Sequence, residues 1–256
     1  MSDLKLFNQT ITNENTQKYL KDVLGEKKNS FVNNITALVS NNASLQKCDA
    51  VSVLYAGIKA TALDLPLDAN LGFAYVIPYG SQAQFQIGYK GFKQLALRTG
   101  LFRVMSETDV KEGEIKSFNR LTGEIEFDWI SDYNERKNKH TIGYVSYFKL
   151  QNGFESTYYR SIDEINDHGK KYSKMYQKGS GLWKDEFDSM ALKTVVKLNL
   201  SKNAPLSIEM QTAILADQAI ITDKGIHYID NDIAMSENNE KAANILSDAI
   251  NNTVIN

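Results

Sequence analysis

The residues with the clearest chemical character are the lysines and aromatic residues between His168 and Lys184. Five lysines and three large rings alternate there without an acidic residue: Lys170, Lys171, Lys174, Lys178, Lys184, Tyr172, Tyr176 and Trp183. Lysines neutralise phosphates and release counterions, and aromatic faces stack on unpaired bases. The segment therefore predicts binding to single-stranded nucleic acid. The alternative is a solvated lysine-rich loop whose rings, Trp183 first, belong to the core.

Two further lysines, Lys193 and Lys197, follow on a predicted amphipathic helix over residues 187–200. Residues four apart lie on the same side of a helix, so both lysines could follow a phosphate backbone from one side. They flank an apolar stripe that consists of Phe187, Ala191, Val195 and Leu198. Because flanking lysines are common on amphipathic helices, a purely structural role stays open.

A glycine-containing turn, Gly88-Tyr89-Lys90-Gly91, joins a predicted strand to a predicted helix. Backbone N–H groups at a helix N-terminus attract phosphate, and Lys90 and Lys93 add positive charge to the same turn. The helix is expected to run to Arg98 and to stop at Gly100, a typical C-terminal glycine. The alternative is a tight connection in which the glycines only permit the bend.

The N-terminal third of the chain, residues 1–63, predicts helices that support these segments. Apolar residues recur there at three- and four-residue steps, which predicts burial against a sheet or against an adjacent protomer. Thr16, Ser30 and Asp49 are the expected N-caps. We find no chemistry in this third of the sequence.

The middle of the chain, residues 73–160, predicts antiparallel strands, because apolar and polar residues alternate between turn signals. In the run from Ala83 to Tyr89, the odd positions are expected on a buried face. After Arg160 the pattern returns to helices, beginning with a capping box, Ser161-x-x-Glu164, and ending with a short helix over residues 207–216. The expected fold class is α+β, with an antiparallel sheet and hairpins flanked by N-terminal and C-terminal helices.

A second hairpin is expected to turn at Asn152-Gly153 through a two-residue type I′ turn. Such a turn would place Lys149 opposite Ser156, Tyr147 opposite Tyr158 and Val145 opposite Arg160. The resulting face would be both aromatic and cationic, with Tyr147, Lys149, Tyr158 and Arg160 together.

Length and charge predict one core with a tail. The chain has 256 residues and a net charge of −2, but from Asp217 onward seven acidic residues stand against two lysines. Residues 1–216 therefore carry a net charge of +3. The acidic, Asn-rich segment 217–256 predicts a flexible solubilising tail. A regulatory or partner-binding segment is the alternative.

Several classes of protein are disfavoured by the composition. Cys48 and the dispersed His140, His168 and His227 do not have the spacing of a zinc site, and no disulfide is expected. The sequence has neither a signal-peptide pattern nor an apolar run long enough for a membrane span. We therefore expect a cytoplasmic protein without a membrane partner.

Enzyme signatures are also weak. The segment Lys178-Gly179-Ser180-Gly181 lacks the frame of a nucleotide-binding loop, so ATP use is not expected. Acidic residues that could hold magnesium in a nuclease occur in two groups: Asp163, Glu164 and Asp167, and Asp185, Glu186 and Asp188. Acidic residues also gather at helix starts because they interact favourably with the helix dipole, and we favour that explanation.

Two blocks of the sequence resemble a known family. The first, within residues 65–100, contains Leu71-Gly72-x-Ala74-Tyr75, Pro78-x-Gly80 and Gln86-Ile87-Gly88-Tyr89-Lys90-Gly91. The second is Trp183-Lys184-Asp185, followed by Met190-Ala191-x-Lys193-Thr194. Together they resemble the RecT/Redβ family of phage single-strand annealing proteins (recombinases), over roughly residues 15–216.

This resemblance implies an ATP-independent protein that binds single-stranded DNA as a homo-oligomer, either a ring or a helical filament. It would pair that strand with its complement during phage homologous recombination in the bacterial host cell and would also hold the annealed duplex. Residues 1–216 would form the annealing and oligomerisation core. No covalent chemistry and no cofactor would be required, with magnesium entering only through the DNA. A phage exonuclease and a host single-strand binding protein are possible partners, although the tail matches no family motif.

The DNA contacts expected from this resemblance and from the charged segments are Tyr89, Lys90, Lys93, Arg98, Tyr147, Lys149, Tyr158, Arg160, Lys170, Lys171, Lys174, Lys184, Lys193 and Lys197. The same residues would serve a general single-strand coating protein that does not anneal. A third hypothesis is an enzyme, a nuclease that uses the carboxylates.

Overall fold

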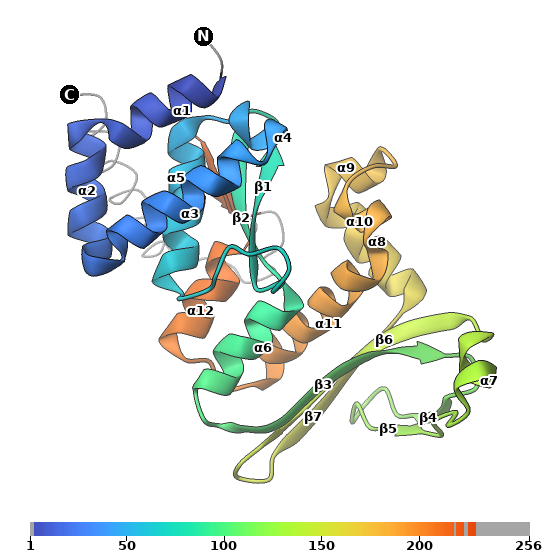
Figure 1. Cartoon of the computed structure of the whole chain (residues 1–256). Coiled ribbons are helices and arrows are strands. Elements are labelled where there is room, and N and C mark those ends of the chain that lie inside the picture. The colour runs from blue at the N-terminus through green and yellow to red at the C-terminus, as the bar shows by residue number, and fades with distance from the viewer. Residues whose placement is uncertain (1–2, 218, 223–224, 229–256) are drawn as a thin grey trace. The chain divides into compact units, whose positions relative to one another are not determined.

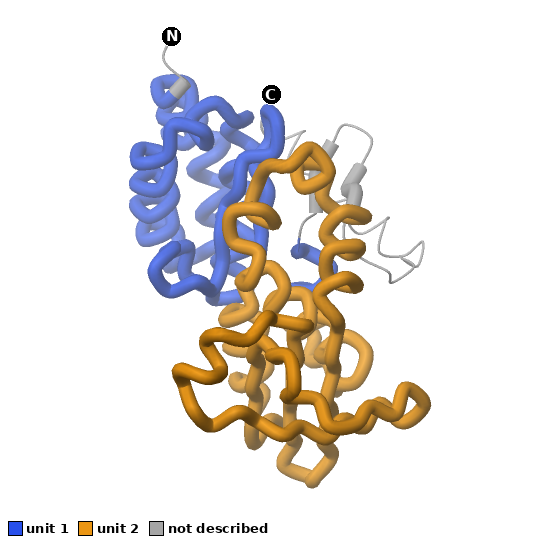
Figure 2. Tube along the Cα trace, turned by 90° about the vertical axis from the view of Figure 1, so that its right-hand side faces the viewer, with its two compact units in different colours: residues 1–87, 212–256 blue, residues 88–211 orange. Residues whose placement is uncertain are grey.

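The computed structural model describes residues 3–217, 219–222 and 225–228. The chain divides into two compact units (Figure 2). Unit 1 consists of residues 1–87 and 212–256, and unit 2 consists of residues 88–211. All the DNA contacts that the sequence predicts, from Tyr89 to Lys197, therefore lie in unit 2.

Most of the elements are labelled in Figure 1. Those before residue 88 are α1 (Asp3–Thr12), α2 (Glu14–Leu24), the 3₁₀ turn η1 (Gly25–Lys27), α3 (Lys28–Ser40), α4 (Ala43–Gln46), α5 (Ala50–Ala62), β1 (Ala74–Tyr79) and β2 (Gln82–Ile87). Unit 2 contains α6 (Tyr89–Arg98), β3 (Phe102–Lys111), β4 (Ile115–Phe118), β5 (Ile125–Phe127), α7 (Tyr133–Lys137), β6 (Thr141–Leu150), β7 (Glu155–Ser161), α8 (Ile162–Tyr172), α9 (Lys174–Gln177), α10 (Leu182–Asp185) and α11 (Phe187–Asn203). The chain continues through α12 (Ile208–Ala216), β8 (Ala219–Thr222) and β9 (Gly225–Tyr228). The predicted α+β class, with helices at both ends of the chain, is confirmed.

Unit 1 is built around α5, which packs on the antiparallel hairpin of β1 and β2. Asp49 is the N-cap of α5 as predicted, because its carboxylate accepts a hydrogen bond from the Ser52 N–H at 2.8 Å. The Ser52 hydroxyl in turn accepts a hydrogen bond from the Ala83 N–H at 2.8 Å. These contacts fix the start of the helix against β2, whose Phe85 and Ile87 are buried.

Three local predictions in this region are wrong. The N-cap of α2 is Asn13, which accepts from the Asn15 N–H at 2.9 Å, and Thr16 is buried inside the helix. Ser30 also lies inside a helix, because η1 leads the chain directly into α3 at Lys28. Tyr89 does not continue the strand of Phe85 and Ile87, since β2 ends at Ile87 and Tyr89 opens α6.

The chain returns to unit 1 within α12, at Thr212. Asp217 is buried and accepts a hydrogen bond from the Ile87 N–H at 2.8 Å, and β8 pairs with β9 in a two-stranded sheet. Residues 229–256 lie outside the described residues, so the predicted flexible tail over 217–256 stays a prediction. In the part of the chain that is described, no helix is long and apolar enough to span a membrane.

Unit 2 is centred on an antiparallel sheet with the strand order β3-β6-β7. One face carries the alternate residues of β6 that are most deeply buried, Tyr144, Ser146 and Phe148. The helix α11 covers this face, because the Asn199 amide donates to the Ser146 carbonyl at 3.0 Å. The side-chain carbonyl oxygen of Asn199 accepts a hydrogen bond from the Ser156 hydroxyl at 2.8 Å.

The predicted register of the β6–β7 hairpin is wrong by one residue. Lys149 pairs with Glu155, Tyr147 with Thr157 and Val145 with Tyr159. The cause is the turn, which has three residues rather than two and closes through a 2.7 Å hydrogen bond from the Leu150 N–H to the Phe154 carbonyl. Gly153 takes the left-handed position of such a turn, with φ of +91°. A slip of one residue moves side chains to the opposite face of the sheet.

An ion network fixes the far end of β3 to α7. The Glu114 side chain is fully buried and accepts from the Arg136 Nε at 2.7 Å and from the Lys111 N–H at 2.7 Å. Asp109 lies 3.0 Å from Arg136 and 2.9 Å from the Lys111 ammonium. Burial works to raise the pKa of Asp109, but the hydrogen bonds from Lys111 and Arg136 outweigh burial and lower it below its ordinary value.

This lowered pKa predicts a contribution of Asp109 to acid sensitivity. Its folded-state pKa lies below the unfolded value of about 3.9, so its stabilisation is present above that pH and is lost as pH falls through the folded-state pKa. We expect the free energy of unfolding, measured by urea titration between about pH 5 and pH 2, to fall less steeply in Asp109→Asn than in the native chain. The same slope in both proteins would contradict this role.

Candidate nucleic-acid interface

The predicted lysine and aromatic segment, residues 168–184, extends from the second half of α8 through α9 into α10. Its lysines are exposed, whereas its rings are buried or half-buried. Trp183 is only 5% exposed and packs in a cluster with Tyr144, Ile165, Met190, Ala191 and Val195. Gly169 on α8 makes room for it, since a Cβ there would stand 2.7 Å from the Trp183 ring. The predicted core position of Trp183 is confirmed, so this ring supports the surface instead of stacking on a base.

The other two rings of the segment are partly buried. Tyr176 packs on the same cluster and its hydroxyl donates to the Asn166 side chain at 2.6 Å. The Lys171 ammonium lies over the ring of Tyr172, 4.6 Å from the ring centroid. Binding of a phosphate beside a base at this cation and ring stays a prediction.

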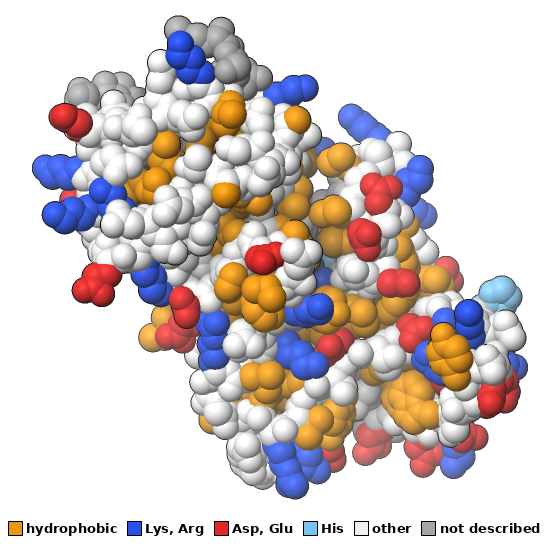
Figure 3. All heavy atoms as spheres, in the orientation of Figure 1, with side chains coloured by type: hydrophobic (Ala, Val, Ile, Leu, Met, Phe, Trp, Pro, Cys, Tyr) orange, Lys and Arg blue, Asp and Glu red, His pale blue; other side chains and the backbone are white. Residues whose placement is uncertain are grey.

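The lysines of this segment point outward. Lys170, Lys171, Lys174, Lys178 and Lys184 are all exposed. Figure 3 shows lysine or arginine side chains, together with acidic ones, over the region of α8–α10. Lys170 and Lys171 lie in the last turn of α8, where positive charge also stabilises the helix dipole. Both side chains are exposed, and they stand on a helix whose capping box at Ser161 and Glu164 is present as predicted.

The corrected hairpin register splits the predicted aromatic and cationic face. Tyr147 and Lys149 lie on the side away from α11, where the Tyr147 hydroxyl donates to Glu155 and the Lys149 ammonium lies 3.5 Å from the same carboxylate. Tyr158 and Arg160 lie on the side of Tyr144. The prediction that these four residues share one face is therefore wrong.

A second group of cations surrounds Tyr158. The Arg160 guanidinium donates to the Tyr158 hydroxyl at 2.8 Å and pairs with Glu164 at 2.6 Å. The Lys202 ammonium stands 5.6 Å from the centroid of the Tyr158 ring. Sequence reasoning missed Lys202, because the helix was predicted to end at Leu200, whereas α11 continues to Asn203.

The connection from β2 to α6 is as predicted, with Gly88 as the N-cap, the helix ending at Arg98 and Gly100 at φ of +70°. Lys90 and Arg98 are exposed, and Tyr89 is half-buried. Lys93 forms an ion pair with Glu107 at 3.1 Å, so the positive charge of Lys93 is partly neutralised within unit 2. Lysines and arginines over α6 are interspersed with acidic side chains in Figure 3.

Lys193 and Lys197 are buried, whereas the prediction of an amphipathic helix places them beside its apolar stripe. Each is only 4% exposed, and α11 is buried around most of its circumference rather than along one stripe. Ala191, Val195 and Asn199 face the sheet, so the two lysines lie on the side of α11 turned away from it. Their role as DNA contacts stays a prediction.

Two of the six carboxylates considered for a magnesium site, Glu164 and Asp188, make other contacts. Glu164 accepts from Arg160 and from the Ser161 N–H, and Asp188 accepts from the Tyr144 hydroxyl. Burial first, then the Asp188 contact, raises the pKa of Tyr144. Among the residues that the structure describes, no three histidine, cysteine or carboxylate side chains gather in a metal-binding group.

Comparison with known proteins identifies the family of this α+β chain. The model of the RecT family matches residues 29–232. The chain therefore belongs to the RecT family, and the resemblance seen in the two motif blocks is confirmed.

Two curated relatives are similar to this chain. The uncharacterized protein YqaK of Bacillus subtilis (strain 168) is 44% identical over 200 residues, which cover 78% of this chain and 68% of YqaK. Protein RecT of Escherichia coli (strain K12) is 28% identical over 186 residues, which cover 68% of this chain and 65% of that protein. The chain thus spans about two thirds of the length of these relatives.

Proposed function

We propose that the chain binds single-stranded DNA through unit 2 and anneals it to a complementary strand, without ATP and without covalent chemistry, in phage homologous recombination. Membership of the RecT family supports this proposal, together with the exposed lysines of α8–α10. The protein would act as a homo-oligomer, a ring or a helical filament, in the cytoplasm of the bacterial host. An exonuclease and a host single-strand binding protein are the proposed partners.

The observation that carries the DNA-binding part is the separation of lysines from rings. Lys170, Lys174 and Lys184 are exposed, whereas Trp183 beneath them is buried. A phosphate backbone can run over such a surface while the bases remain outward. Outward bases can then be tested by a second strand, and complementary base pairing supplies the sequence specificity.

The test is pairing of two labelled complementary oligonucleotides, followed by fluorescence without ATP. We expect the protein to accelerate pairing and the variant Lys170→Ala/Lys174→Ala/Lys184→Ala to lose most of this acceleration. For the single strand, log Kd changes with log salt by about 0.7 per neutralised phosphate, so the variant should reduce this slope by about 2. The matched control is Lys116→Ala/Lys137→Ala/Lys139→Ala, three exposed lysines elsewhere in unit 2, which should keep the native slope.

Three outcomes would contradict the proposal at different points. Tight single-strand binding without faster pairing would leave a coating protein, the alternative function. An equal loss of salt slope in the control variant would show that α8–α10 has no special role in binding. Cleavage of the oligonucleotides in magnesium, abolished by Asp185→Ala, would indicate a nuclease instead.

A further inference from the structure

A leucine at the tip of the β4–β5 hairpin in unit 2 is almost fully exposed. Leu121 is 94% exposed, the highest value among the exposed large apolar residues of the described chain. The turn that holds it is ordered: the Asn119 side chain accepts from the Leu121 N–H at 3.0 Å, and the Gly123 N–H donates to the Asn119 carbonyl at 2.8 Å. An apolar side chain held in water by a defined turn is suited to insertion into an apolar pocket.

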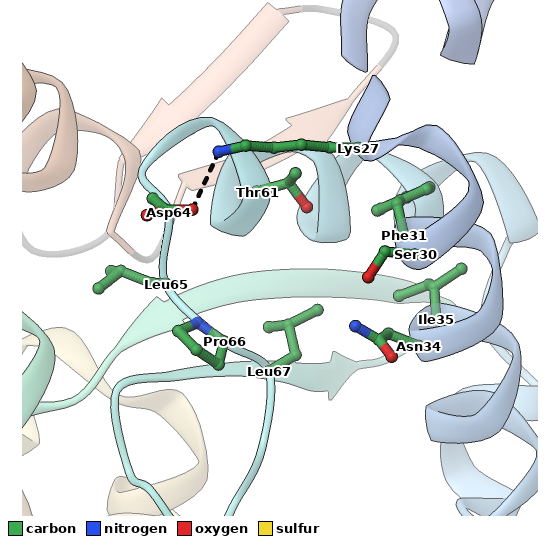
Figure 4. A pocket seen from close by; sticks show the side chains of 10 residues that line it. All are labelled: Lys27, Ser30, Phe31, Asn34, Ile35, Thr61, Asp64, Leu65, Pro66 and Leu67. Carbon is green, nitrogen blue, oxygen red and sulfur yellow. Dashed lines mark hydrogen bonds and ion pairs between the residues drawn. The ribbon is translucent and has the colours of Figure 1, made fainter. Parts of the chain in front are cut away.

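Unit 1 contains such a pocket, with a volume of about 320 Å³. Figure 4 shows that it lies between α3 on one side and the end of α5 with its following loop on the other. Phe31, Ile35 and Leu65 are buried at this site, and Pro66 and Leu67 complete the apolar lining. The space is at the lower end of the range for small-ligand sites, so a leucine side chain fits into it.

The pocket wall is fixed before anything binds. The α5 helix ends in a Schellman motif, with hydrogen bonds from the Leu65 N–H to the Ala60 carbonyl at 2.9 Å and from the Asp64 N–H to the Thr61 carbonyl at 3.1 Å. Asp64 has φ of +53°, the left-handed conformation that this motif requires and that is uncommon outside glycine. The loop therefore holds one shape.

The charges around the two surfaces are complementary. At the pocket, Lys27 and Asp64 form an exposed ion pair at 2.9 Å. At the hairpin tip, Arg120 precedes Leu121 and Glu124 lies across the turn. Each surface thus has one cation and one anion beside an apolar centre, so Arg120 can meet Asp64 while Glu124 meets Lys27.

We propose that Leu121 of one copy of the chain inserts into the pocket between α3 and α5 of a second copy. The contact joins two different surfaces, and each copy gives its leucine to one neighbour and receives a leucine from another, so the assembly is heterologous. Repetition of this contact builds a ring when the rotation closes and a helical filament when it does not. This interface rests on the oligomeric state proposed above and names the surfaces that form it.

Two variants disable the contact from opposite sides. Leu121→Glu removes the inserting side chain, and Asn34→Arg places a long charged chain at the exposed edge of the pocket. We expect each to weaken self-association at least about tenfold, which is the order expected for losing one buried leucine. Leu101→Glu, a leucine 44% exposed elsewhere in unit 2, is the matched control and should assemble like the native chain.

The decisive measurement is the mass of the full-length proteins by light scattering after size exclusion, with and without single-stranded DNA. Each variant alone should have the monomer mass of 28.8 kDa. An equimolar mixture should form one dimer and no more, because the Asn34→Arg chain keeps its leucine and the Leu121→Glu chain keeps its pocket. Circular dichroism should show both variants folded.

Several results would overturn this interface. They are a native chain that stays monomeric with and without DNA, a Leu121→Glu chain that assembles normally, or a mixture that remains monomeric. Binding of a short oligonucleotide by the monomeric variants separates the interface from the proposed function. If the dissociation constant for the oligonucleotide stays within about threefold of the native value, the variants have lost assembly alone. If the native chain assembles but neither binds nor pairs DNA, the proposed function fails and the interface stands.

Discussion

Replacing Arg136 by methionine is expected to lower the free energy of unfolding of unit 2 by about 3 kcal/mol. The reason is Glu114, whose side chain is fully buried and receives two hydrogen bonds from this guanidinium, at 2.7 and 3.2 Å. Without Arg136, a buried carboxylate keeps only the Lys111 N–H among the partners described above. An ion left buried without its counterion costs several kcal/mol, and the 27% exposure of Arg136 puts this case at the low end.

The measurement is urea unfolding at pH 7, with two comparisons. Lys137→Met, one residue further along α7 and exposed, should change stability by less than about 0.5 kcal/mol. Combining Arg136→Met with Glu114→Gln should recover part of the loss, because the buried group is then neutral. If Arg136→Met alone is as stable as the native chain, the network does not hold β3 to α7.

Replacing Trp183 by alanine is expected to cost about 3 to 5 kcal/mol of stability, the usual range for a large buried ring. Its ring lies 5.8 Å from that of Tyr176 and 6.2 Å from that of Phe187, and it fills the space left by Gly169. Trp183→Phe should cost less, because most of the apolar contact is kept. The loss of the ring removes the support beneath the lysines of α8–α10.

The comparison for this variant is Trp129→Ala. Trp129 is 45% exposed and stacks on Phe127 at 4.5 Å, so its removal should cost clearly less. The chain has two tryptophans, so each variant leaves a single tryptophan whose fluorescence can follow unfolding. Normal stability of Trp183→Ala combined with a loss of single-strand binding would show that this ring stacks on bases and does not support the core.

The sequence predicts the features that depend on neighbouring residues. The start of α5 at Asp49, the capping box of α8 and the strand-to-helix connection at Gly88 all follow local rules of hydrogen bonding and backbone conformation. The burial of Trp183 agrees with the alternative that the sequence leaves open, in which rings of the lysine-rich segment, Trp183 first, belong to the core.

The wrong predictions depend on information that is not local. The register of the β6–β7 hairpin depends on whether Gly153 belongs to a two-residue or a three-residue turn, and the sequence Asn152-Gly153 is compatible with both. The burial of Lys193 and Lys197 depends on how many sides of α11 are covered, which the spacing of its apolar residues does not reveal. The sequence does not mark the turn that exposes Leu121, since a single leucine in a polar loop carries no periodic signal.

The division of the chain has a consequence for its synthesis. Unit 2 is one continuous segment, residues 88–211, whereas unit 1 draws on segments from both sides of it. During translation, all the strands of the β3-β6-β7 sheet and the helix α11 leave the ribosome before Asp217, which accepts the hydrogen bond of Ile87. Domains fold as they emerge, so unit 2, which carries the lysines, can fold before the N-terminal helices make their contacts with the C-terminal segment of unit 1. A nascent chain would thus acquire its cationic surface before it acquires a finished unit 1.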